Sequence, residues 1–258
     1  MSAAAADLAT GLWPSVTSAA ANAMAPTTSL SNRMASLDWS VIAGELDTSG
    51  AAVIPALLSA AQCAELASSY ALAQAFRSRV VMAKHGFGRG EYQYFRYPLP
   101  ALVEQLRISL YAALAPIANR WSAAANYPAT LAAFLERCHA AGQTRPTPLL
   151  LRYGAGDYNC LHQDLYGEQV FPLQATVLLS KPGEQFDGGE FVLTEQRPRM
   201  QSRVEVVPLG RGDAVVFAVH HRPVAGSRGT HRVNMRHGVS RIRRGERYTL
   251  GIVLHDAT

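Results

Sequence analysis

The sequence predicts one domain with an all-β core of the jelly-roll type, supported by α-helices. The chain has 258 residues, of which 48% are hydrophobic, so it can bury one substantial core. Its second half contains short apolar runs separated by Gly, Pro and charged turns, a pattern typical of strands. Strands at this spacing favour a two-sheet sandwich or jelly roll. The expected strands are LLLRY, QATVLLS, EFVLTE, RVEVV, AVVFAV and YTLGIVLH.

The N-terminal end of the chain differs in composition from the remainder. Residues 1–36 are mostly Ala, Ser, Thr and Pro with very little charge, so we expect a flexible extension. Residues 37–258 are expected to form the single folded domain. In that domain, helical support occupies 37–145 and the jelly-roll core occupies 146–258.

The supporting region has recognisable helix signals. Ser59 followed by Gln62 is a capping-box arrangement, which predicts a helix beginning after Ser59. Gly142 predicts the end of the last supporting helix. The expected elements are a short helix over 37–46, a strand over 50–58, and helices over 60–76, 102–121 and 128–142.

A glycine-rich and aromatic segment lies between these helices. Three glycines, at 86, 88 and 90, make it bendable, and aromatic residues alternate with arginines after them. Such a segment can stack on a flat substrate or contact an anionic one. An ordinary strand with one aromatic face explains the pattern equally well. The candidate substrate-binding residues in this segment are Arg89, Tyr92, Tyr94 and Arg96.

Positive charge is concentrated near the C-terminus. The formal net charge is +5, yet residues 197–247 contain twelve Arg and three acidic residues, whereas residues 1–196 carry twelve Lys or Arg and fifteen acidic residues. A concentrated positive field suits a phosphate-bearing partner, and Arg197 and Arg199 are further candidate contacts. The alternative is a compositional bias toward Arg, since the chain has 22 Arg and 2 Lys, although bias does not explain the clustering.

The sequence favours a cytoplasmic location. No apolar run approaches the roughly 18 residues of a membrane-spanning helix, and the N-terminus does not resemble a signal peptide. Three widely spaced cysteines argue against a disulfide framework and for a reducing compartment. Cys160 is expected to be a small packed residue rather than a metal ligand.

One stretch predicts a metal site. Residues i and i+2 of a β-strand lie on the same face, so His162 and Asp164 on a strand would point toward one place. Two His and one carboxylate form the facial triad of non-haem iron(II) oxygenases, which leaves positions open for cosubstrate and oxygen. The pair therefore needs a second histidine from elsewhere in the chain.

Four later histidines compete for that position: His220, His221, His231 and His237. His237 is preferred because Gly245 and Arg247 follow it, with Arg247 ten residues on, at the start of an apolar strand. A guanidinium there can form a bidentate pair with a dicarboxylate whose other end chelates the metal. We expect His220 and His221 to be surface or substrate-facing residues.

These motifs, in this order, resemble the iron(II)- and 2-oxoglutarate-dependent dioxygenases of the branch that includes prolyl 4-hydroxylases. The resemblance covers residues 40–256 and rests on GAAVIPALLSAAQC, RYGAGDYNCLHQD, DGGEFVL, PLGRGDAVVFAV and RHGVSRIRRGERYTL. It implies a double-stranded β-helix in which His162, Asp164 and His237 bind iron(II). It also implies that Arg247 binds the distal carboxylate of 2-oxoglutarate, assisted by the Tyr153 hydroxyl. Arg247 stands where animal collagen-type prolyl hydroxylases usually have Lys.

The resemblance implies an enzyme that uses 2-oxoglutarate and O2 to hydroxylate a C–H bond, releasing succinate and CO2. The substrate stays open. The Arg cluster and the aromatic segment favour alkylated or single-stranded DNA, and thus oxidative dealkylation in DNA repair. The ten-residue spacing from His237 to Arg247 favours the alternative of a protein or amino-acid hydroxylase. A jelly-roll binding module without turnover is a third hypothesis.

Overall fold

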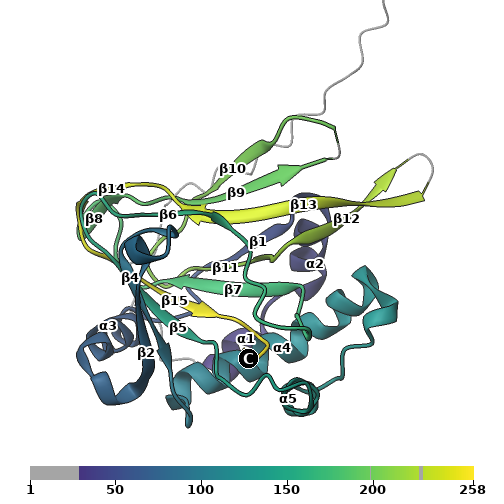
Figure 1. Cartoon of the computed structure of the whole chain (residues 1–258), viewed down its shortest axis with the longest axis horizontal. Helices are drawn as coiled ribbons and strands as arrows, with labels where there is room; N and C mark the ends of the chain where they lie inside the picture. The colour runs from purple at the N-terminus through teal and green to yellow at the C-terminus, as the bar shows by residue number, and fades with distance from the viewer. Residues whose placement is uncertain (1–28, 198, 227–228) are drawn as a thin grey trace, which may run out of the picture.

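Two antiparallel sheets lie one above the other in the computed structural model, which describes residues 29–197, 199–226 and 229–258. The expected β-rich jelly-roll core is confirmed (Figure 1). The seven-stranded sheet has the order β1-β11-β7-β15-β5-β4-β2. Its strands are β1 (Ala51–Ile54), β2 (Phe76–Val81), β4 (Glu91–Phe95), β5 (Leu149–Tyr153), β7 (Leu173–Leu178), β11 (Ala214–Ala218) and β15 (Arg247–Ile252).

The second sheet has the order β10-β9-β13-β6-β3, and β12 extends it by pairing with β13. Its strands are β3 (Gly88–Arg89), β6 (Tyr158–His162), β9 (Phe191–Gln196), β10 (Arg203–Val207), β12 (His221–Gly226) and β13 (Gly229–Val239). A separate two-stranded sheet joins β8 (Phe186–Gly188) to β14 (Ile242–Gly245). In Figure 1 the β9–β10 and β12–β13 hairpins project from the second sheet.

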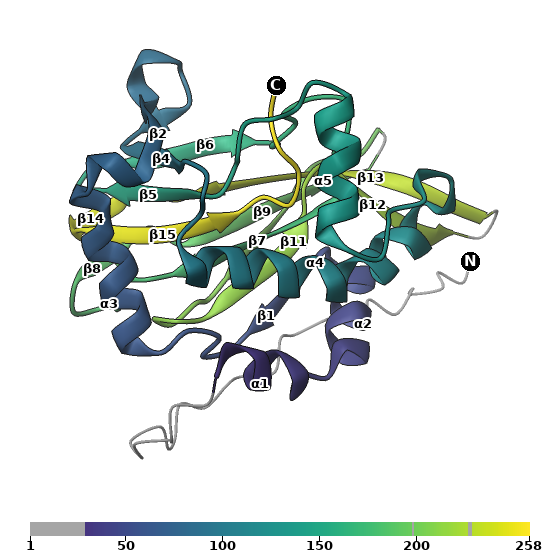
Figure 2. The same cartoon turned by 90° about the horizontal axis from the view of Figure 1, so that it is seen from below.

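Helices cover the outer face of the seven-stranded sheet, as both views show (Figures 1 and 2). The largest apolar cluster joins Leu106 and Leu110 of the longest helix to Leu150, Val177 and Leu250 of the sheet. The opposite face of the sheet looks toward the second sheet and carries the polar residues described below. The helices are α1 (Leu30–Ala35), α2 (Trp39–Ser49), α3 (Ala60–Ser68), α4 (Ala101–Trp121) and α5 (Leu131–Ala140). Short 3-10 helices occupy Ser69–Ala71, Ala73–Ala75, Met82–Lys84 and Ala123–Ala125.

Helix α4 corrects one expectation from the sequence. It is long and apolar enough, by length and composition alone, to cross a membrane. Half of this apolar stretch is buried inside the protein, and its buried apolar side chains belong to the main apolar cluster. We therefore interpret α4 as a core helix, whose apolar composition reflects contact with the sheet.

The expected flexible extension is too long at its C-terminal end. Helix α1 lies within it, capped by the Ser29 hydroxyl, and Leu30 and Met34 are buried. These two residues are one helical turn apart, so a single face of α1 joins the core. Residues 1–28 lie outside the part that the structure describes.

The supporting region is less helical than expected. The capping box at Ser59 and Gln62 is present, but α3 ends at Ser68 rather than continuing to residue 76. The hydroxyls of Ser68 and Ser69 donate to the Glu65 and Leu66 carbonyls, and such local bonds compete with helix continuation. Four strands, β1 to β4, also come from residues 37–145, so both sheets begin in the region expected to be support.

Candidate active site

Two histidines are placed opposite each other by strand pairing. His162 is the last residue of β6, and His237 on β13 is its partner in the antiparallel register. Cross-strand partners have closely spaced side chains, and the two imidazole ring centroids are 4.2 Å apart. A contact between residues 75 positions apart therefore follows from the pairing of β6 with β13.

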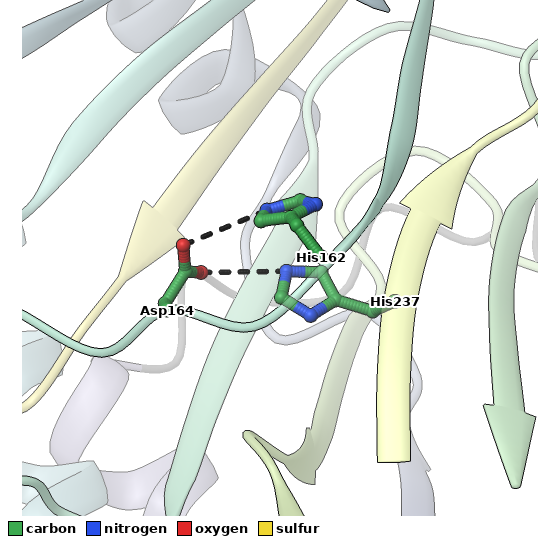
Figure 3. Close-up of side chains that lie close together, drawn as sticks. All are labelled: His162, Asp164 and His237. Carbon is green, nitrogen blue, oxygen red and sulfur yellow. Dashed lines mark ion pairs between the residues drawn. The ribbon is translucent and has the colours of Figure 1, made fainter. Parts of the chain in front are cut away.

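Asp164 completes the group from the segment after β6 (Figure 3). Its carboxylate oxygens lie 3.5 Å from His162 Nε2 and 3.3 Å from His237 Nε2. The Tyr166 hydroxyl donates to one oxygen at 2.6 Å, and Gln174 Nε2 donates to the other at 2.7 Å. The expectation that His162 and Asp164 share a strand was wrong in detail, because β6 ends at His162.

Gln163 keeps this segment aligned with β13 beyond the end of β6. Its side-chain amide donates to the carbonyls of Met235 at 2.7 Å and His220 at 3.3 Å, and to Asn234 Oδ1 at 3.2 Å. These bonds continue the connection between the two strands after the backbone ladder stops. Gln163 therefore fixes where His162 and Asp164 stand relative to His237.

The protonation of the histidines suits metal binding. His162 Nδ1 lies 2.8 Å from the Cys160 carbonyl, which can only accept, so Nδ1 carries the proton and Nε2 offers a lone pair. His237 is buried, and its ring packs 4.6 Å from that of Phe217. Burial and the neighbouring His162 lower the pKa of His237 and keep it neutral.

The carboxylate of Asp164 is held in its charged form. Burial alone would raise its pKa, but the hydrogen bonds from His237 and Tyr166 oppose burial, and the pKa lies well below its usual range. The ligand atoms of His162, Asp164 and His237 all lie within 4.8 Å of one another. Two neutral imidazoles and one carboxylate are the donor set of the facial triad, so these residues fit iron(II).

A second group in the cavity fits the cosubstrate. Arg247, the first residue of β15, is 1% exposed, and its partner in the strand register is Tyr153. Its guanidinium donates to the Thr249 hydroxyl, but no carboxylate among the described residues lies within 4 Å of it. Arg247 Nε and the Tyr153 hydroxyl are both buried without a hydrogen-bond partner in the described part of the chain.

An unpaired buried guanidinium is costly unless a ligand satisfies it. Burial lowers the pKa of Arg247 to about 10, which still leaves it charged at neutral pH. Burial also raises the pKa of Tyr153, so its hydroxyl remains a donor. These groups fit the distal carboxylate of 2-oxoglutarate, with Arg247 and Tyr153 as the residues that would hold it.

Both groups line one cavity of about 320 Å³ between the two sheets. Gly189 makes room for Arg247: its φ is +63°, and an added Cβ would lie 2.2 Å from Ile242 Cδ1 and 3.0 Å from Arg247 Cδ. This contact explains the second glycine of the DGGEFVL motif. A larger hollow of about 510 Å³ beside β2 contains none of these groups, so chemistry rather than size identifies the site. When bound, iron(II), 2-oxoglutarate and O2 supply the oxidising chemistry, and the protein residues orient them.

Of the six candidate substrate-binding residues, the structure brings Tyr92 alone to this cavity. Tyr94 is 8% exposed and packs with Leu149 and Val253, so it is a core residue, as the strand interpretation of β4 predicted. The other four residues are exposed and do not line the cavity. They are Arg89, Arg96, Arg197 and Arg199. Arg89 lies 3.8 Å from Asp157, and Arg197 lies 3.3 Å from Glu195.

The other histidine candidates lie apart from the triad. The rings of His220 and His221 are 4.2 Å apart, and neither residue lines the cavity. His231 is exposed on β13 and pairs with Val224. Sequence reasoning missed Gln163, Tyr166 and Gln174, which position the ligands. Gln174 had a visible signal, since it is a polar residue at the start of a fully buried strand.

Solved structures of other proteins have a similar fold. A prolyl-4-hydroxylase from Pseudomonas putida matches with a TM-score of 0.51 and 17% identity, over 83% of this chain and 96% of that protein. A 2OG-Fe(II) oxygenase family oxidoreductase from Burkholderia pseudomallei matches with a TM-score of 0.53 and 17% identity, over 86% and 94% of the two chains. The fold and the triad define an iron(II)- and 2-oxoglutarate-dependent dioxygenase.

The sequence places the protein in a particular family within this class. The model of the family Oxygenase-NA, described as an oxygenase catalysing oxidative methylation of damaged DNA, matches residues 90–257, and the chain belongs to this family. Two uncharacterized proteins of Mycobacterium tuberculosis, Rv2227 and MT2286, are each 51% identical to it over 167 residues. That match spans 63% of this chain and 72% of each relative.

Proposed function

We propose that the protein removes alkyl groups from damaged DNA by oxidation. The observation that carries this proposal is membership of a family described as acting on damaged DNA, together with a complete iron and 2-oxoglutarate site. His162, Asp164 and His237 would hold the iron, and Arg247 with Tyr153 would hold the cosubstrate. The exposed arginines described next would contact the phosphate backbone.

Oxidative removal of a methyl group from a base nitrogen is a balanced reaction. One oxygen atom of O2 enters the C–H bond to give N–CH2–OH, and the other enters succinate as 2-oxoglutarate loses CO2. The hydroxymethyl adduct then breaks its C–N bond, releases formaldehyde and returns the proton to nitrogen. An oxygenase of this type therefore takes a methyl group away.

The arginines of residues 197–247 fall into two groups. Five of the described ones are paired or buried: Arg197, Arg203 and Arg222 share Glu195, Arg244 pairs with Asp187, and Arg247 lies in the cavity. The remaining described ones are exposed, with no carboxylate within 4 Å among the residues that the structure covers. They are Arg199, Arg211, Arg232, Arg236, Arg241 and Arg243. Exposed, unpaired arginines suit contacts with phosphates.

The test is turnover of a short single-stranded DNA carrying one methylated base, with iron(II), 2-oxoglutarate and air. We expect succinate to rise with the DNA and formaldehyde to appear in equal amount, and we expect His162→Ala to abolish both. Slow, His162-dependent succinate formation that ignores DNA would overturn the proposal. Peptides would then be the next substrates to test, by a gain of one oxygen atom in mass.

A further inference from the structure

An aromatic pair lies at the mouth of the catalytic cavity. Phe87 lines the same cavity as His162 and His237, and 48% of its surface is exposed. Its ring stacks on that of His85, with the ring centroids 5.3 Å apart and the planes inclined by 22°. His85 is exposed as well. Phe87 therefore presents a half-exposed ring beside the metal site.

The position of Phe87 is fixed relative to the triad. Its N–H donates to the Met82 carbonyl at 3.2 Å, and its own carbonyl accepts from the Cys160 N–H at 2.9 Å. The next residue, Gly88, pairs with Asn159 of β6. Because β6 ends in His162, these bonds connect the ring of Phe87 to the strand that carries a metal ligand. Figures 1 and 2 both show the segment between β2 and β4 beside β6.

Gly88 makes this approach possible. Its φ is +125°, and a Cβ added to it would lie 2.4 Å from the Tyr158 carbonyl oxygen. No L-residue with a side chain fits there without moving β6. The glycines noted in the sequence therefore bring Phe87 close to the metal site.

The lining of the cavity indicates what Phe87 contacts. Among the described lining residues, Arg247 is the single Lys or Arg, and it belongs to the cosubstrate site. The mouth is formed by rings, Leu161 and neutral polar groups, so it suits a flat, uncharged or delocalised group rather than a phosphate. A nucleobase offers such a π-face, and stacking on aromatic side chains is the usual way proteins hold unpaired bases.

We propose that Phe87, backed by His85, is the surface on which the substrate base stacks while its alkyl group points at the metal centre. This inference rests on the proposed function. Phe87 contacts the substrate but neither the triad nor Arg247. Its removal should therefore weaken DNA binding and leave the reaction of 2-oxoglutarate without DNA unchanged.

The experiment uses the full chain with iron(II), 2-oxoglutarate and single-stranded DNA containing one 3-methylcytosine. Initial rates of formaldehyde release give KM and kcat for Phe87→Leu, Phe87→Tyr, His85→Ala and Leu165→Ala. Leu165 is the matched control, because it is also 48% exposed but does not line the cavity. Succinate formed without DNA reports whether each variant keeps an intact metal and cosubstrate site.

Loss of the stacking ring should raise KM for the DNA about tenfold in Phe87→Leu, with a smaller change in kcat. Phe87→Tyr and Leu165→Ala should stay within about twofold of the wild type, and His85→Ala should raise KM by roughly two- to threefold. A Phe87→Leu enzyme with wild-type KM overturns the inference alone. Absence of formaldehyde with the wild-type enzyme overturns the proposed function, and the stacking role falls with it. If Phe87→Leu also loses DNA-independent succinate formation, its metal and cosubstrate site is damaged, and the KM of His85→Ala for the DNA is used instead. An unchanged KM in His85→Ala overturns the inference.

Discussion

At the scale of single residues, two arginines have the same burial and opposite roles. Arg107 and Arg247 are each 1% exposed. Arg107 Nη2 lies 2.7 Å from Asp256 Oδ1, and its other nitrogens donate to the Val253 carbonyl and the Tyr97 hydroxyl. Arg247 has no such carboxylate among the described residues. The first arginine therefore stabilises the fold, whereas the second is available to a ligand.

Replacing each arginine by methionine should separate these roles. Arg107→Met leaves Asp256 buried without its main partner, so the free energy of unfolding should fall by about 3–5 kcal/mol. Arg247→Met removes an unpaired buried charge, so the unliganded protein should be equally stable or more stable by about 1 kcal/mol. Its affinity for 2-oxoglutarate should fall at least about 100-fold, because a charged bidentate pair is lost. Urea unfolding and calorimetric titration of the manganese-loaded protein measure both effects, and an unstable Arg247→Met variant would contradict this assignment.

The residues that sequence reasoning could predict are those in local motifs. His162 with Asp164, and His237 with Arg247, sit in short patterns whose spacing carries the chemistry. Two of the residues that it missed, Gln163 and Gln174, act through side chains that reach other segments of the chain. Gln163 contacts Met235 across 72 positions, and Gln174 on β7 reaches Asp164 in the segment after β6. Only strand pairing brings such residues together, and a motif does not contain that information.

At the scale of secondary-structure elements, the β12–β13 hairpin combines the site with the positive surface. Val233, Met235 and His237 are buried on one face of β13, and Arg232 and Arg236 are exposed on the other. Successive residues of a strand point to opposite faces, so one strand supplies both a metal ligand and a row of cations. The hairpin should therefore place the DNA backbone relative to the iron site.

Neutralising both exposed arginines tests this role. For Arg232→Gln combined with Arg236→Gln, the slope of log affinity against log salt concentration should decrease in magnitude by about 1.4 on single-stranded DNA. Arg120→Gln is the control, because Arg120 is exposed on α4 but paired with Asp47 at 3.1 Å. That control should change the slope much less. Equal slopes for the double variant and the wild type would exclude these residues as phosphate contacts.

The two strands of this hairpin, β12 and β13, were not predicted from the sequence. The expected strands left out the segment 220–236, which contains Pro223, Gly226 and several charges. In the structure β12 pairs with β13 alone, and an edge strand tolerates proline since one side of it needs no donor. The alternation of Val233, Met235, His237 and Val239 was a period-two signal that could have revealed β13. Similarly, Leu30 and Met34 carried a helical signal within the expected extension.

At the scale of the whole molecule, the C-terminal segment joins the helical layer to the sheets. His255 and Asp256 are completely buried. Asp256 contacts Arg107 of α4 and His139 of α5, and the His255 ring accepts a hydrogen bond from the Phe171 N–H at 3.3 Å. Burial lowers the pKa of His255 from 6.5 to about 4, so folding is coupled to pH through this residue.

The sign of this coupling follows from proton binding. Between pH 6.5 and 4 the unfolded chain protonates His255 and the folded chain does not, so the free energy of unfolding falls as the pH decreases. The free energy of unfolding falls by roughly 3 kcal/mol across this pH range, and His255 causes no such loss above pH 6.5. His255→Asn, whose Oδ1 can accept the same hydrogen bond, should lose less stability than the wild type between pH 7 and 4.5. Urea unfolding at both pH values measures this difference, and parallel losses in the two proteins would contradict it.

The two halves of the active site belong to different sheets, His162 and His237 to one and Tyr153 and Arg247 to the other. The distance between the two histidines and the Arg247 guanidinium is thus set by the spacing of two hydrogen-bonded sheets rather than by a flexible loop. The cavity should consequently select its cosubstrate by chain length. We therefore expect a five-carbon 2-oxo diacid to bind more tightly than an analogue that is one carbon shorter or longer. Selectivity for chain length is thereby built into the packing of the sandwich.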